Sequence, residues 1–121
     1  MTIQSLINKV QEEKPNSFAD SKLVAYIDEI ETDVAEQLCV ERDTEYTAED
    51  SMNVELLAPA PYDRLYVSWL KSQIDYANEE YTSYQLNADQ FNSDFTEFIN
   101  WIVRTGQAPE YAFPSRFRNV F

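Results

Sequence analysis

The sequence predicts an all-α protein, and three observations lead to that class. Apolar residues recur at three- and four-residue steps through most of the chain, which is typical of helices with one buried face. The 121 residues include one glycine, so tight hairpin turns are scarce and an all-β fold is disfavoured. A hydrophobic content of 44% indicates a folded chain despite a formal net charge of −13. We expect a small bundle of about four helices, roughly over residues 2–13, 18–39, 61–84 and 88–105.

The first helix has a start signal and a stop signal. Thr2 can cap its N-terminus, and the chain should leave the helix near Glu13, just before Pro15. Apolar residues fall on one face between these two points. They are Ile3, Leu6, Ile7 and Val10.

The second helix is expected to begin at a capping box, because Ser17 and Asp20 have the spacing of that motif. Apolar residues at near-heptad steps carry it to about Cys39. Acids on the other face indicate a solvated surface. They are Asp28, Glu29, Glu31, Asp33 and Glu36.

Residues 41–60 show no sustained period and are expected to form a long loop, in which 54–56 could be a short extended piece. Eleven acids and a single base, Arg42, lie between Asp28 and Glu55. Such an acidic surface suggests repulsion of DNA, mimicry of DNA, or pairing with a basic partner.

The stretch 61–84 is read as one long central helix around which the bundle is organised. Pro61 suits the first helical position, and the carboxylate of Asp63 would face the positive end of the helix dipole. Asp75 interrupts the apolar stretch, and a structural hydrogen-bonding role is expected for it. The aromatic residues cover more than one face, so part of this helix should serve as an assembly surface. The core positions expected on it are Tyr62, Leu65, Tyr66 and Trp69.

The last helix carries two start signals. Asn87 and Gln90 have the spacing of a capping box, and Leu86 has that of a hydrophobic staple with Phe91. Gly106 suits the left-handed position after the helix. The core positions expected here are Phe91, Phe95, Phe98 and Ile102.

Residues 1–106 are therefore expected to form the bundle domain, and 107–121 an extended C-terminal docking tail. Two prolines stop any helix in this tail, and its composition is basic and apolar on an acidic body. Docking across its own helices and docking on another subunit both fit this composition. The residues expected to anchor it are Arg116, Phe117, Arg118, Val120 and Phe121.

Several kinds of chemistry are excluded by composition. The chain has no histidine and one cysteine, so it lacks the residues of a Ser-His-Asp or Cys-His centre and of a structural zinc site. One glycine is too few for a nucleotide-binding loop. We expect no catalytic, cofactor-binding or metal site, and hence no enzyme. No apolar run approaches the length of a membrane span, and no secretory signal is recognisable.

Two segments and the C-terminal end carry a family resemblance. Pro-Ala-Pro-Tyr-Asp-Arg-Leu-Tyr at 59–66, Gln-Ile-Asp-Tyr-Ala-Asn-Glu-Glu-Tyr at 73–81 and the closing Arg-Phe-Arg-Asn-Val-Phe resemble the head–tail connector (adaptor, or head completion) proteins of tailed phages. The resemblance covers residues 54–121, and the first 50 only in their helical pattern.

The resemblance implies a virion protein of the neck, made in the host cytoplasm. Such adaptors look like small helical bundles that form a ring, commonly twelvefold, beneath the portal protein. They join the head to the next connector (the stopper) or to the tail, and DNA passes through the ring without specific binding.

Two other functions remain open from the sequence. The acids between Asp28 and Glu55 could occupy the basic groove of a nucleic-acid enzyme, as in an acidic DNA mimic or inhibitor. A helical scaffold or regulatory protein of another kind would fit the same pattern.

Overall fold

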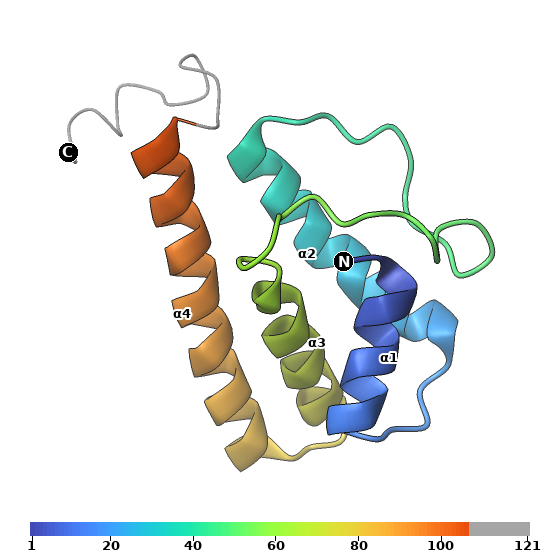
Figure 1. Ribbon diagram of the computed structural model, residues 1–121. Coiled ribbons are helices and arrows are strands. Elements are labelled where there is room, and N and C mark those ends of the chain that lie inside the picture. The colour runs from blue at the N-terminus through green and yellow to red at the C-terminus, as the bar shows by residue number, and fades with distance from the viewer. Residues whose placement is uncertain (107–121) are drawn as a thin grey trace.

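A computed structural model describes residues 1–106 of the chain, and these form a bundle of four helices (Figure 1). The prediction of an all-α bundle is confirmed. The proposed tail, 107–121, lies outside the described residues, as do all five of its expected anchor positions. The helices are α1 (Ile3–Glu13), α2 (Asp20–Leu38), α3 (Arg64–Ala77) and α4 (Tyr81–Thr105).

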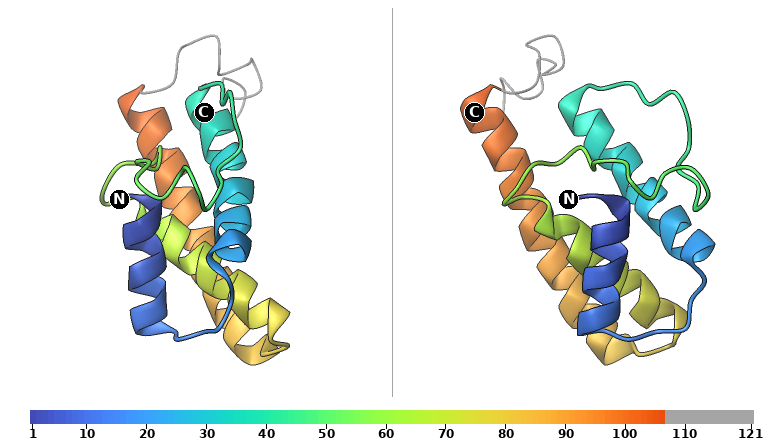
Figure 2. Two further views of the ribbon diagram at one scale, coloured as in Figure 1. Left: turned by 90° about the vertical axis from the view of Figure 1, so that its right-hand side faces the viewer. Right: turned by 45° about the vertical axis from the view of Figure 1, so that its right-hand side comes forward.

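Helix α3 lies at the centre of the bundle and packs against α1, α2 and α4. The longest helix, α4, runs antiparallel beside it, while α1 and α2 lie toward its other side (Figures 1 and 2). This arrangement agrees with the expectation that the chain is organised around the segment after Pro61.

The core draws on all four helices and on the segment before α3. Leu65, Tyr66, Phe98 and Ile102 are fully buried or nearly so, as expected. Burial of a side chain of this size contributes about 1.5–3 kcal/mol. The other expected core residues are partly buried and pack against this core. They are Tyr62, Trp69, Phe91 and Phe95.

The central stretch is not one helix, and this expectation was wrong. Helix α3 begins at Arg64 and ends at Ala77, the chain turns through 78–80, and α4 starts seven residues earlier than expected. Glu79 adopts a left-handed backbone at φ 59° within the turn. Apolar spacing continues across this turn without a break, so periodicity alone could not locate it.

Asp75 holds the turn together. Its side chain is fully buried, and its Oδ2 accepts hydrogen bonds from Ser83 Oγ at 2.8 Å and Asn87 Nδ2 at 2.6 Å. Its Oδ1 lies 2.5 Å from Lys14 Nζ, at the end of α1. A buried carboxylate needs such partners, and a helix reversal brings them to it. The structural hydrogen-bonding role expected for Asp75 is confirmed.

The expected start of the last helix at a capping box formed by Asn87 and Gln90 was also wrong. Asn87 and Gln90 lie inside α4 and cap nothing. Asn87 binds Asp75, and Gln90 Nε2 donates to the buried carboxylate of Asp94 at 2.9 Å. At the other end of α4, Gly106 takes the expected left-handed conformation, with φ 66°.

The remaining caps were predicted with mixed success. Thr2 forms the expected cap on α1, accepting the Ser5 backbone N–H at 3.1 Å. No Ser17–Asp20 capping box forms, because Asp20 is the first residue of α2 and the preceding Ala19 has no side-chain acceptor. Asp63 precedes α3 without a side-chain capping bond. Its carboxylate lies 4.0 Å from the Met1 amino group, an ion-pair partner that competes with a capping role.

The loop after α2 returns to the N-terminus, where the expected extended piece forms. Residues 54–56 run antiparallel to residues 1–3, with hydrogen bonds from Ile3 N to Val54 O at 3.2 Å and from Leu56 N to Met1 O at 2.9 Å. Both apolar ends of the piece pack against the core, so the loop is part of the folded domain.

Glu31 is the largest departure from the sequence-based expectation, because it is fully buried. Its Oε1 accepts a hydrogen bond from the Tyr66 hydroxyl at 2.5 Å. Its Oε2 accepts two more, from the Tyr46 hydroxyl at 2.9 Å and from the Leu57 backbone N–H at 3.0 Å. Burial and the adjacent carboxylate both raise the pKa of the two tyrosines. Glu31 therefore joins α2, the loop and α3 at one point.

Asp75 also makes stability depend on pH. Burial alone would raise its pKa, but hydrogen bonds from Lys14, Asn87 and Ser83 hold the pKa below its usual value. A lowered carboxyl pKa contributes stability that is fully present above the unfolded value of about 4 and is lost as the pH falls further. We expect the Asp75→Asn variant to lose less stability than the native chain between pH 5 and pH 2, measured as urea midpoints. Parallel losses in the two proteins would contradict this.

Candidate interaction surface

Three tyrosines, Tyr76, Tyr81 and Tyr84, gather where α3 passes into α4. We call this group the tyrosine corner, which is distinct from the β-sandwich motif of the same name. The Tyr76 ring lies 6.2 Å from that of Tyr81 and 5.3 Å from that of Tyr84, centre to centre. Tyr76 is 60% exposed and Tyr81 58%, the largest exposures of any aromatic side chain in residues 1–106. Tyrosine is favoured at protein interfaces, since its ring is apolar and its hydroxyl can stay hydrated.

The corner is also acidic. The two residues before Tyr81 are Glu79 and Glu80, and both are exposed. The Glu80 carboxylate lies 3.5 Å from Lys14 Nζ, whereas no ion pair forms at Glu79 within residues 1–106. An aromatic surface with a carboxylate beside it suits a ligand that is both apolar and cationic.

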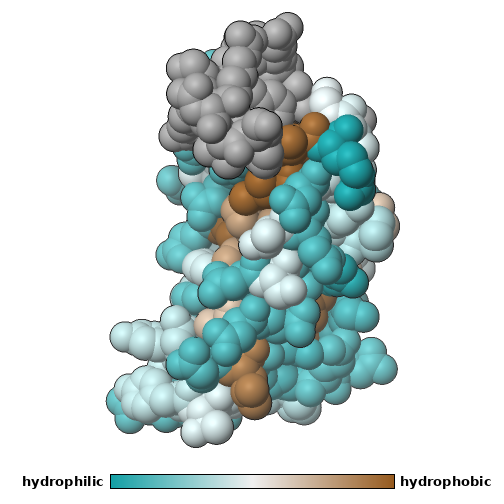
Figure 3. Space-filling view, turned by 90° about the vertical axis from the view of Figure 1, so that its left-hand side faces the viewer, coloured by the Kyte–Doolittle hydropathy of each residue, from teal (hydrophilic) through white to brown (hydrophobic). Residues whose placement is uncertain are grey.

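Two further large apolar side chains are exposed outside the tyrosine corner. Leu86 is 68% exposed and Val40 45%. The face along α4 is mostly hydrophilic, with hydrophobic residues in a narrow, broken strip (Figure 3). The tyrosine corner is therefore the main group of contacting, exposed aromatic side chains in the described part of the chain.

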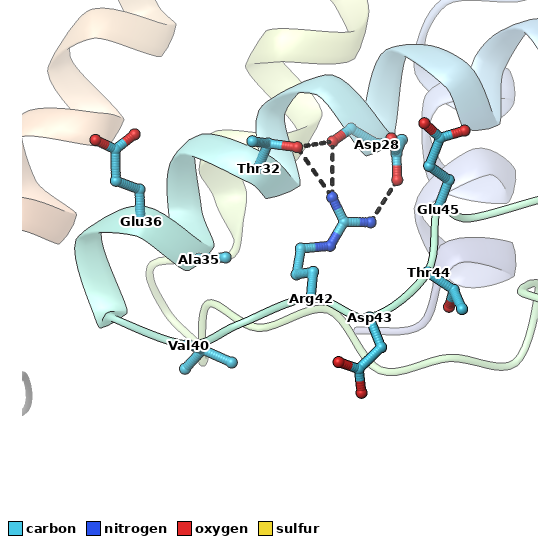
Figure 4. A pocket seen from close by; sticks show the side chains of 9 residues that line it. All are labelled: Asp28, Thr32, Ala35, Glu36, Val40, Arg42, Asp43, Thr44 and Glu45. Atoms are coloured by element: carbon cyan, nitrogen blue, oxygen red, sulfur yellow. Dashed lines mark hydrogen bonds and ion pairs between the residues drawn. The ribbon is translucent and has the colours of Figure 1, made fainter.

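A cavity of about 420 Å³ lies between α2 and residues 40–45 (Figure 4). Arg42 reaches across it to α2, where its guanidinium donates to Thr32 Oγ1 at 3.0 Å and pairs with the Asp28 carboxylate. The guanidinium also stacks over the Tyr46 ring, at 4.4 Å. Arg42 therefore holds the loop after α2 to that helix. The exposed acids around the cavity are Glu36, Asp43 and Glu45.

The structure divides the three tyrosines between α3 and α4, although the sequence had placed all of them on one helix. Tyr81 and Tyr84 fall within 61–84, the stretch expected to be one central helix, but they lie on α4, and Tyr81 is mainly exposed. The tyrosine corner was therefore missed as a unit. The apolar pattern gave no signal for a chain reversal, because Ala77 and Tyr81 keep a four-residue step across the polar residues 78–80.

Within residues 1–106, no group of three or more cysteine, aspartate and glutamate side chains is arranged to hold a metal ion. None of the four helices is long and apolar enough to cross a membrane.

Comparison with known proteins gives no match. No family model, no curated protein and no solved structure is similar to this chain.

Proposed function

We propose that this chain is a structural assembly protein, a head–tail adaptor subunit of a tailed phage. The observation that carries the proposal is the tyrosine corner, an exposed aromatic surface built by two helices. The resemblance of residues 59–66, 73–81 and 116–121 to phage connector proteins supplies the specific role. In this role the subunits form a twelvefold ring between the portal protein and the next connector or tail component.

A ring needs two different complementary surfaces on each subunit. The tyrosine corner lies at the N-terminal end of α4, and the basic, apolar tail begins after the other end. Because α4 has 25 residues, the two ends are about 37 Å apart. This separation supports head-to-tail contacts between subunits and leaves surface for the portal protein or the next connector.

The charge of the chain also supports this role. A net charge of −13 disfavours binding to phosphates, so DNA could pass such a ring without being held. In this proposal the protein works in the virion neck, through interfaces alone, with no cofactor and no chemical step.

Removal of residues 115–121 tests the proposal. We expect filled heads and complete tails that fail to join, because the deletion removes all five expected anchor residues. Electron microscopy and infectivity titres of phage carrying the deletion give the readout. Circular dichroism of the purified variant should match that of the native chain, since the four described helices end at Thr105. Infectious particles at the normal titre would contradict the proposal.

The DNA-mimic alternative is less well supported. It relies on the eleven acids between Asp28 and Glu55, but Glu31 is buried and Asp28 is paired with Arg42. Two of the eleven are therefore unavailable to a basic groove. The alternative predicts co-purification with a polymerase or nuclease, whereas the adaptor predicts co-purification with portal protein.

A further inference from the structure

We infer that the tyrosine corner of one copy binds the C-terminal tail of a second copy. This inference rests on the proposed assembly function and names the two surfaces that meet. It is supported by the composition of the tail and the corner, by the distance from the corner to Gly106 in one copy, and by the hydrophilic face along α4 (Figure 3).

The two surfaces are chemically complementary. The corner offers exposed tyrosine rings and the Glu79 carboxylate, while the tail offers phenylalanines and two arginines. Arginine stacks on tyrosine faces, and phenylalanine packs against them. Only one acid, Glu110, lies in the tail, so its charge is opposite to that of the corner. Complementary charge gives the contact its orientation.

The distance restricts docking of the tail within one copy. The corner lies about 37 Å back along α4 from Gly106. A fully extended chain spans at most about 3.6 Å per residue, so Phe113 reaches about 25 Å from Gly106 and Phe117 about 40 Å. Within one copy, the residues from Phe117 onward could touch the corner and Phe113 could not. A neighbouring subunit removes this restriction.

The surface between the two ends also argues against docking within one copy. A tail returning along α4 would cross a mainly hydrophilic face (Figure 3). Its apolar side chains would gain little there, because burial of apolar area against apolar area supplies the driving force. Docking on the corner of a neighbour places these side chains directly against the tyrosine rings.

The acidic cavity beside α2 is a poorer receptor for the tail. It offers one exposed apolar side chain, Val40, to a tail that carries three phenylalanines and a valine. Arg42 already pairs with Asp28 and covers the Tyr46 ring, so this aromatic face is not free for the tail. Val40 therefore provides a matched control, since it is an exposed apolar residue outside the proposed contact.

Photo-crosslinking of the full chain tests the inference. Phe117→p-benzoylphenylalanine places a crosslinker in the tail, and equal amounts of natural-abundance and ¹⁵N-labelled protein are mixed before irradiation. We expect mixed-isotope crosslinks between position 117 and residues 76–84. The added Tyr76→Ser/Tyr81→Ser changes should reduce their yield at least about fivefold, as expected for loss of central aromatic contacts. Val40→Ser should leave the yield unchanged.

A synthetic peptide of residues 107–121 provides the second measurement. Added to the native chain, it should bind with an affinity that falls as salt is raised, and it should compete with the crosslink. Crosslinks confined to one isotope would place the tail on its own copy and overturn the inference. Crosslinks to other segments, or no crosslink and no peptide binding, would overturn it as well. Both measurements use the purified chain, so a failure here would leave the adaptor role to be decided by the phage deletion.

Discussion

Glu31→Ala is expected to destabilise the fold by about 3–5 kcal/mol, the range for breaking a buried charged hydrogen-bond network. The substitution removes the acceptor of three donors, namely the hydroxyls of Tyr46 and Tyr66 and the N–H of Leu57. Each donor would be left in or near the core without a partner. The free energy of unfolding, from urea titrations followed by circular dichroism, measures the effect.

Glu29→Ala is the matched control, because Glu29 lies on the same helix and is exposed. It should change stability by no more than about 0.5 kcal/mol. A double-mutant cycle with Tyr66→Phe would isolate the 2.5 Å hydrogen bond, and we expect a coupling of about 1–3 kcal/mol. Equal effects of the two glutamate substitutions would show that the hydrogen bonds of Glu31 add nothing to the stability of the fold.

The second large effect is expected at Asp75. Asp75→Ala leaves Ser83, Asn87 and the Lys14 ammonium without their shared acceptor. The Lys14 side chain is 21% exposed, so water can partly replace the lost contact. We therefore expect a smaller loss than at Glu31, about 2–3 kcal/mol.

Asp89→Ala serves as the control, since Asp89 is an exposed acid on α4, and its effect should stay within about 0.5 kcal/mol. Asp75 also positions the turn that brings Tyr76 beside Tyr81 and Tyr84. Loss of the Asp75 contacts should therefore weaken binding of the 107–121 peptide even under conditions where the bundle remains folded. Full peptide affinity in a folded Asp75→Ala variant would show that the corner keeps its geometry without this carboxylate.

Glu31 and Asp75 show how buried acids can help to stabilise a small bundle. Both sit where segments distant in sequence meet, Glu31 between α2, the loop and α3, and Asp75 between α1, α3 and α4. Each accepts several hydrogen bonds, which offsets the cost of burial and fixes the relative positions of the segments. The contacts of Asp75 hold the turn at which the tyrosine corner forms.

The sequence by itself determined the class of the fold, four helical regions, and several of the ends. Apolar spacing identified the buried faces of α1 and α2, the Thr2 cap and Gly106 marked two ends, and residues 54–56 were expected as a short extended piece. These features depend on local rules that operate within a few residues: helical periodicity, side-chain caps and backbone preference. The same local rules made Leu65, Tyr66, Phe98 and Ile102 recognisable as core.

Only the tertiary structure decided where the central stretch breaks and which acids are buried. Glu31 follows Ile30 and lies four residues after Ile27, on the flank of the apolar face, so its burial depends on what packs there. The hydroxyls of Tyr46 and Tyr66 come from 15 and 35 residues away. The reversal at 78–80 likewise depends on Lys14, a distant partner of Asp75. A local pattern carries no information about such partners, and so the tyrosine corner became visible only in the folded chain.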